Sequence, residues 1–90
     1  MALFALGQVV ATSGALAALE KAEQEPHAFL DRHVNGDWGE VSDGDKQENE
    51  SAIMQGFRIF SAYTTSAGDR LWIITEADRS ATTILLPDEY

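Results

Sequence analysis

The stretch from Phe57 to Pro87 constrains the fold of this chain most, because it contains three β-rich runs separated by two short polar connections. β-branched and aromatic residues, which suit a pleated strand, are dense in each run. Both connections are too short for the crossover that joins parallel strands. The sequence therefore predicts an antiparallel meander with strands at residues 57–65, 70–77 and 81–86.

Side-chain alternation assigns the two faces of the middle run. Trp72 and Ile74 share one face, which is bordered by a charged residue at each end, whereas Leu71 and Ile73 share an uncharged face. We therefore expect Leu71 and Ile73 to face the core. Because Trp72 is large enough to be buried as well, this strand is expected to lie centrally in the sheet or to be covered on both faces.

The preceding residues predict one strand and three helices. A first strand is expected at residues 4–11, at a sheet edge or beside the last strand, with a bulge or close approach at Gly7. The helix that follows is capped by Thr12 or Ser13 and carries Leu16, Leu19 and Ala22 at helical spacing. A second helix starts near Pro26 and stops at Asn35-Gly36, and a third runs from Ser42 to Gly56.

The predicted fold class is therefore α+β, with a single domain over residues 1–90. We expect two layers, in which an antiparallel sheet of three to four strands is covered on one face by two or three helices, in the order β-α-α-α-β-β-β.

The formal net charge is −9, and the acidic residues are unevenly distributed. Residues 1–56 hold ten acidic residues against three basic ones, whereas residues 57–90 hold five against three. Such a field repels phosphate backbones, so we expect no direct nucleic-acid binding. The acidity either keeps a small protein soluble or provides a surface for a basic, nucleic-acid-binding protein partner, as in a DNA mimic.

The sequence gives little indication of a membrane or exported protein, or of a cofactor. The chain has no cysteine and no apolar run near the roughly 20 residues of a membrane span, and its apolar start lacks a basic leader. We expect a cytoplasmic protein without a membrane partner. Neither a phosphate-binding glycine loop nor a nucleophile elbow is found, and no cofactor or metal is predicted.

Residues 36–39 form a predicted tight turn that places Trp38 beside Asp37 between two glycines. Either the indole folds back onto the edge of the core, or it is exposed and anchors a partner. Asp37 and Trp38 are candidate binding residues on the second interpretation. His33 lies on the apolar stripe of its helix and is interpreted as a hydrogen-bonded, half-buried side chain rather than a catalytic base.

The turn between the last two predicted strands gathers Glu76, Asp78 and Arg79 with several hydroxyl groups. With Tyr63 or Arg58 from the neighbouring strand, these side chains could form a polar pocket or a contact surface. The alternative is a hairpin in which Asp78 caps the turn and Arg79 pairs with Glu76. Glu76, Asp78, Arg79, Tyr63 and Trp72 complete the set of candidate binding residues.

The segments LGQVVAT, GDWGEV, GFRIFSAYTTSAG and LWIITEADRSATTILLP together resemble a widespread family of small bacterial proteins without an established function. The resemblance spans essentially the whole chain. Members are often carried on plasmids, integrated elements and phage-derived islands. The resemblance implies an accessory protein of a mobile element that binds and modulates a host or rival protein, and it implies no catalytic residue.

Three functional hypotheses follow from the sequence. The first is a small acidic, non-enzymatic protein-binding module, such as an anti-restriction or anti-CRISPR-like counter-defence factor. The alternative is a toxin-like hydrolase or ribonuclease, because the order of elements is similar to that of the RelE and ParE toxins, although the basic cluster of those proteins is missing here. The third is a homodimer that pairs a sheet edge or the Trp72 face.

Overall fold

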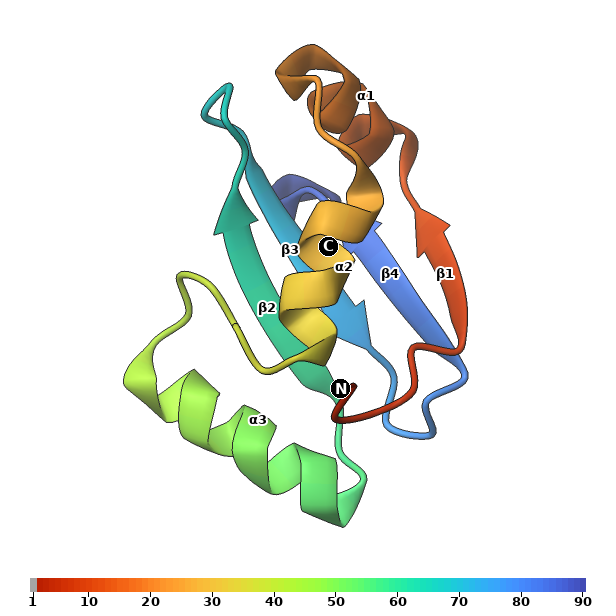
Figure 1. Ribbon diagram of the computed structural model, residues 1–90, viewed down its shortest axis with the longest axis vertical. Helices are drawn as coiled ribbons and strands as arrows, with labels where there is room; N and C mark the ends of the chain where they lie inside the picture. The colour runs from red at the N-terminus through yellow and green to blue at the C-terminus, as the bar shows by residue number, and fades with distance from the viewer. Residues whose placement is uncertain (1) are drawn as a thin grey trace.

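The computed structural model describes residues 2–90, and within them it has three helices and four strands in the predicted order (Figure 1). The α+β fold class is confirmed. A short 3-10 turn, η1 (Pro87–Glu89), follows the last strand. The other elements are β1 (Gln8–Ala11), α1 (Ser13–Ala22), α2 (Pro26–Val34), α3 (Asp43–Gln55), β2 (Ile59–Thr64), β3 (Arg70–Thr75) and β4 (Ala81–Leu85).

The four strands form one sheet in the order β1-β4-β3-β2. The predicted meander is confirmed, because β2, β3 and β4 pair in antiparallel fashion through consecutive hairpins. β1 lies at the edge beside β4 and pairs with it in parallel, so the sheet is mixed rather than purely antiparallel. The long helical connection from β1 to β2 explains this difference, since it does not force the chain to reverse as a hairpin does.

The helix boundaries follow from local capping. The Thr12 side chain accepts a hydrogen bond from the Ala15 amide at the start of α1, and the Ser42 side chain accepts one from the Asp45 amide at the start of α3. Pro26 occupies the first turn of α2, where its missing N–H leaves no intrahelical bond unmade. Gly56 ends α3 in the left-handed conformation that a glycine adopts without strain.

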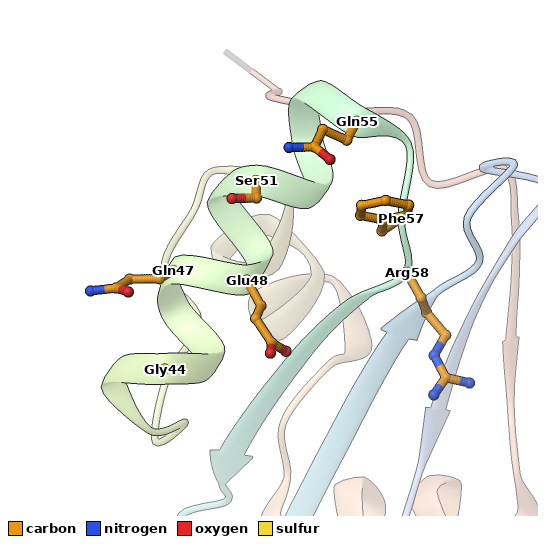
Figure 2. A pocket seen from close by; sticks show the side chains of 7 residues that line it. All are labelled: Gly44, Gln47, Glu48, Ser51, Gln55, Phe57 and Arg58. Atoms are coloured by element: carbon orange, nitrogen blue, oxygen red, sulfur yellow. The ribbon is translucent and has the colours of Figure 1, made fainter.

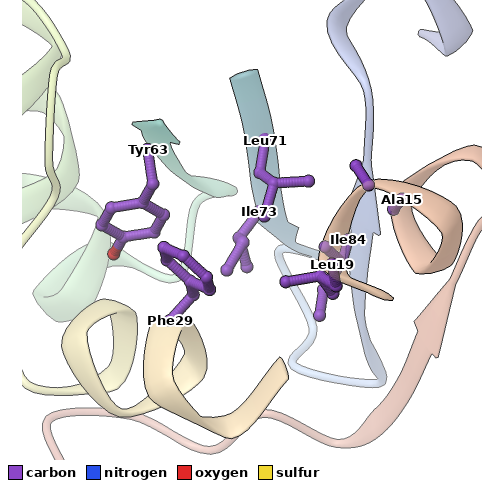
Figure 3. Packing of buried hydrophobic residues seen from close by; sticks show 8 residues of the cluster. Ala15, Leu19, Phe29, Tyr63, Leu71, Ile73 and Ile84 are labelled. Atoms are coloured by element: carbon purple, nitrogen blue, oxygen red, sulfur yellow. The ribbon is translucent and has the colours of Figure 1, made fainter. Parts of the chain in front are cut away.

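The main core lies between the sheet and the two helices α1 and α2, which cover the same face (Figures 1 and 3). Leu71 and Ile73 are completely buried there, as alternation predicts. Figure 3 shows Phe29 of α2 beside Tyr63 of β2. Leu16 is 50% exposed, because α1 turns Ala15, Ala18 and Leu19 to the sheet instead. The buried residues of this cluster are Ala15, Ala18, Leu19, Phe29, Tyr63, Leu71, Ile73 and Ile84.

A second, smaller cluster connects α3 with the edge of the sheet at β2. Trp38, Ala52 of α3 and Ile59 of β2 are buried together, and Phe4 packs against them. α3 therefore lies beside β2 rather than across the sheet (Figure 1). As a result, among residues 2–90 no α-helix lies over the face of the sheet opposite α1 and α2.

A chain of hydrogen bonds runs through the interior. His33 of α2 is completely buried, with Nδ1 2.5 Å from Ser61 Oγ and Nε2 2.9 Å from Thr75 Oγ1. Thr75 Oγ1 lies 2.8 Å from Thr82 Oγ1, which in turn donates to the Leu6 carbonyl oxygen at 2.7 Å. The chain joins α2 to β2, β3 and β4 and to the segment before β1.

The Leu6 carbonyl sets the direction of every bond in this chain, because a carbonyl oxygen can only accept. Thr82 uses its one hydroxyl proton there, so Thr75 must donate to Thr82 and accept from His33 Nε2–H. Burial lowers the pKa of His33 to about 4, so the imidazole is neutral at neutral pH. Its one proton is then on Nε2, and Nδ1 accepts from the Ser61 hydroxyl.

Replacing Thr75 with valine tests how much this chain of hydrogen bonds contributes to the free energy of unfolding. Thr75→Val preserves the shape of the side chain but leaves the buried His33 Nε2–H without an acceptor, and we expect a loss of about 2 kcal/mol in the free energy of unfolding. Thr83→Val is the matched control, since Thr83 lies on the uncovered face of β4. Urea denaturation measures both, and equal effects of the two variants would contradict the assignment.

Stability should fall as the pH is lowered from about 6.5 to about 4. The pKa of His33 is about 4 in the folded protein and about 6.5 in an unfolded chain, so the unfolded state binds more protons in this window. Stability therefore rises with pH there, and the gap between the two pKa values corresponds to about 3 kcal/mol. Urea titrations at several pH values test this. The exposed-histidine variant His27→Gln should keep the same slope, and a flat profile for wild type would refute the prediction.

Candidate functional site

The predicted turn around Asp37 is fastened to β2. Tyr63 Oη donates to the Asp37 carbonyl oxygen at 2.6 Å. The Asp37 carboxylate accepts from Arg32 Nε at 2.7 Å and from the Gly39 amide at 3.3 Å. The Arg32 guanidinium also lies 4.5 Å from the centroid of the Tyr63 ring. Two of the candidate residues, Asp37 and Tyr63, are thus brought together with Arg32, which the sequence did not single out.

The charges at this corner are fixed at neutral pH. The hydrogen bond from Arg32 lowers the pKa of the Asp37 carboxyl, and the same bond raises the pKa of Arg32. Burial raises the pKa of the Tyr63 phenol to about 12. Asp37 is exposed and ionised, whereas Tyr63 is buried and protonated. The corner is therefore a structural clasp whose exposed groups are the paired side chains of Arg32 and Asp37.

Trp38 is not an exposed anchor, because only 5% of its surface is accessible. Its indole stacks on Phe4 and contacts the His33 ring edge-on, at centroid distances of 6.2 and 5.9 Å. Gly39 allows this by taking a φ of +74°, and a Cβ there would lie 2.0 Å from the Ala62 carbonyl oxygen. The turn is thus pulled against β2, which directs the indole inward and corrects the binding prediction for Trp38.

The hairpin residues Asp78 and Arg79 bind backbone groups. Asp78 accepts from the Ser80 amide at 3.0 Å, and these hydrogen bonds to Ser80 lower its pKa. The Arg79 guanidinium donates to the carbonyl oxygens of Phe57 at 2.7 Å and Ala52 at 2.9 Å. It also bonds the Glu76 and Ala77 carbonyl oxygens at 3.1 Å. Arg79 thereby ties the β3–β4 turn to the end of α3.

The polar pocket predicted from Tyr63 and the hairpin does not form. Tyr63 pairs with Leu71 at the start of β3, whereas the hairpin follows Thr75 at the end of the same strand. Tyr63 also points to the helix-covered face, where it is buried. Glu76 is exposed, but its contact with Arg79 passes through its carbonyl oxygen rather than through its carboxylate.

Trp72 lies on the uncovered face of the sheet and is half-buried there. Phe60 and Tyr90 contact its ring edge-on, with centroid distances of 5.1 and 5.7 Å. Arg58 donates to the Tyr90 hydroxyl at 2.9 Å. These side chains and Ile74 line a hollow of about 220 Å³.

A second, wider groove lies along α3. It has a volume of about 660 Å³, with Glu48 and Ser51 of α3 on one side and Phe57 and Arg58 on the other (Figure 2). Arg58 lines both cavities, which are therefore neighbours. We refer to the combined surface as the aromatic groove, formed by Gly44, Gln47, Glu48, Ser51, Gln55, Phe57, Arg58, Phe60, Trp72, Ile74 and Tyr90.

The aromatic groove has the composition of a binding surface. Phe57 is 57% exposed, and Tyr90 is exposed as well. Aromatic residues and arginine dominate the energetics of protein interfaces, because they bury a large area while keeping a polar end. Glu48 and Arg58 are the charged residues that line it, so it can accept both a cation and a carbonyl or carboxylate group.

Of the predicted binding residues, Trp72 alone belongs to the aromatic groove. Phe60 and Tyr90 were missed, and Arg58 was considered only as a neighbour of the hairpin. One signal was available, because Phe60 alternates with the core residue Ile59 and pairs with Ile74 across an antiparallel hairpin. Tyr90 gave no signal, since its position over Trp72 depends on the turn η1 after β4.

Residues 2–90 hold no group of three or more histidine, aspartate or glutamate side chains able to bind a metal ion. None of their helices is both long and apolar enough to cross a bilayer. Comparison with known protein families, with curated proteins and with solved structures found no match for this chain.

Arg79→Lys should destabilise the fold although it keeps the charge. A lysine ammonium cannot reach the carbonyls of Ala52 and Phe57 with the planar geometry of a guanidinium. We expect a loss of about 2 kcal/mol in the free energy of unfolding, measured by urea denaturation. Arg70→Lys is the matched control, because Arg70 is exposed and makes a weak ion pair, with its Nε 4.0 Å from Glu40 Oε1. An unchanged stability of Arg79→Lys would show that these bonds contribute little.

Proposed function

We propose that this chain is a small acidic protein-binding module that acts without catalysis and docks its partner in the aromatic groove. The observation that carries the proposal is the row formed by Phe60, Trp72 and Tyr90 on the face of the sheet that no helix covers. Exposed aromatic surface beside a charged rim is typical of a protein interaction site.

The charge of the chain favours a basic partner. The net charge of −9 would steer a basic protein toward this molecule, and the excess of acidic residues includes Glu48 of α3, which lines the groove. A lysine or arginine of the partner could lie between Glu48 and the exposed ring of Phe57, where ion pairing and cation–π attraction act together. Electrostatic attraction would thus bring the partner to this molecule, and the aromatic rings would provide the contact area.

The resemblance described above makes the proposal more specific. An accessory protein of a mobile element gains most by binding a host or rival protein that itself binds nucleic acid, and such proteins carry basic surfaces. On this basis we propose a counter-defence role, of the anti-restriction or anti-CRISPR-like kind. The acidic side of α3 would then occupy the site that the partner uses for nucleic acid.

The alternative of a toxin-like hydrolase or ribonuclease has no specific observation in its favour. Asp78 and Arg79 of the hairpin are engaged by backbone groups. The Ser61–His33 pair has the residue types of a nucleophile and its base, but both side chains are completely buried. Growth arrest on expression would support that alternative.

Phe57→Lys should abolish partner capture while leaving the fold intact, because it removes an exposed aromatic ring and places a positive charge where the basic partner docks. The measurement is a tagged pull-down from the native host at low and moderate salt, with mass spectrometry of the retained proteins. Wild type is expected to retain one stoichiometric basic protein that is lost as salt rises.

Leu16→Lys is the matched control, since Leu16 is exposed to a similar degree but lies on α1, at the other end of the molecule from α3. It adds the same charge and should retain the partner. Equal capture by Phe57→Lys and wild type would refute the groove as the docking site, and retention of no protein by wild type would refute the proposed function.

A further inference from the structure

β1 is an outer edge of the sheet, and among residues 2–90 it pairs with β4 alone (Figure 1). The amides of Gln8 and Thr12 each donate to a carbonyl oxygen on the β4 side at 3.0 Å. Because backbone direction alternates along a strand, the N–H and C=O groups of Val9 and Ala11 point away from β4. The edge therefore offers two donors and two acceptors at the spacing of an extended chain.

The β1 edge lacks the charged side chains and the proline that commonly keep sheet edges apart. Val9 is 43% exposed and Val10 is 41% exposed. Residues 1–19 contain no acidic and no basic side chain, and the first charge of the sequence is Glu20. This is the longest uncharged stretch of a chain that is otherwise strongly acidic.

The opposite edge of the sheet, at β2, is closed by the protein itself. The Asn49 side chain donates to the Phe60 carbonyl oxygen at 2.7 Å and accepts from the Phe60 amide at 3.0 Å. Further along β2, the Ala62 amide donates to Trp38 O at 3.1 Å, and the Glu40 amide donates to Ala62 O at 2.7 Å. The outward backbone groups of Phe60 and Ala62 on β2 are thus paired within the molecule, whereas the β1 edge is open.

We propose that a second copy of this chain pairs with the open edge, so that two β1 strands meet in antiparallel fashion about a two-fold axis. Two molecules of net charge −9 repel each other through most of their surfaces. The uncharged β1 edge is where they can approach without bringing carboxylates together. An isologous edge needs no other partner, because the same donors and acceptors serve both copies.

The register follows from the outward groups. Val9 of each copy exchanges hydrogen bonds with Ala11 of the other, which places the two Val10 residues opposite each other on the axis as a non-hydrogen-bonded pair. Side chains are closest in such a pair. Val10 shares a face with its β4 partner Thr83, which is the uncovered face. The dimer would therefore have one eight-stranded sheet with an aromatic groove at each end of the same face.

Sedimentation equilibrium of the purified full chain tests this arrangement. Wild type is expected to be a dimer whose dissociation constant decreases as salt screens the repulsion, which is opposite to the salt effect on a basic partner. Val10→Lys and Val10→Glu should each weaken self-association by about tenfold or more, because like charges would meet at the axis. An equimolar mixture of the two variants should restore a heterodimer, and the uncharged control Val10→Thr should remain dimeric.

Val9→Pro provides an independent test. It removes only an outward N–H, so the ladder to β4 stays complete, while the ring blocks the second copy. A folded monomer is expected by circular dichroism and sedimentation.

Three results would overturn the proposal. One is a wild-type monomer at every concentration up to about 1 mM. Another is a dimer that neither Val9→Pro nor the charged Val10 variants affect, which would place the interface elsewhere. The third is a wild-type monomer whose β1 edge instead pairs with an extended segment of the captured partner, shown by loss of capture in Val9→Pro. Partner capture by Phe57→Lys is measured separately from self-association, so failure of the dimer and failure of the docking site are distinguishable.

Discussion

The buried hydrogen-bond chain that starts at Ser61 and passes through His33, Thr75 and Thr82 to the Leu6 carbonyl is the interaction on which the rest of this structure depends. It contacts every strand except β1, and it holds the segment that leads into β1. A small domain has little core area to spare for polar groups, so each must be paired. In the described residues every buried side-chain nitrogen and oxygen has a hydrogen-bond partner.

The same chain of hydrogen bonds also determines which surfaces of the protein remain free. His33 lies on α2, so its bonds fix the helix layer to one face of the sheet and leave the other face without a helix. Trp38 and Arg79 then fasten α3 at the β2 edge, where it forms one wall of the aromatic groove. The open face and the open β1 edge therefore follow from the way in which the buried polar side chains are hydrogen-bonded. The proposed docking and self-association use these two surfaces.

Much of the fold could be predicted from the sequence, because strand runs, hairpin lengths and helix caps are local signals. Leu71 and Ile73 were placed correctly by alternation alone. The parallel pairing of β1 was not predicted, since strand direction across a long connection has no local signal. The inward position of Trp38 depends on contacts of Gly39 with β2, and the role of Arg79 depends on carbonyls of α3. Such long-range partners decide whether a polar or aromatic residue serves the fold or a ligand.

Site-specific photo-crosslinking in the native host tests the central claim most directly, because it reports the docking surface before the partner is known. A photoreactive phenylalanine analogue would replace Phe57 in the aromatic groove, or Leu16 on α1 as the matched position of similar exposure. We predict a single crosslinked protein from position 57 and none from position 16. A crosslink from position 16 without one from position 57 would contradict the assignment of the groove as the docking surface.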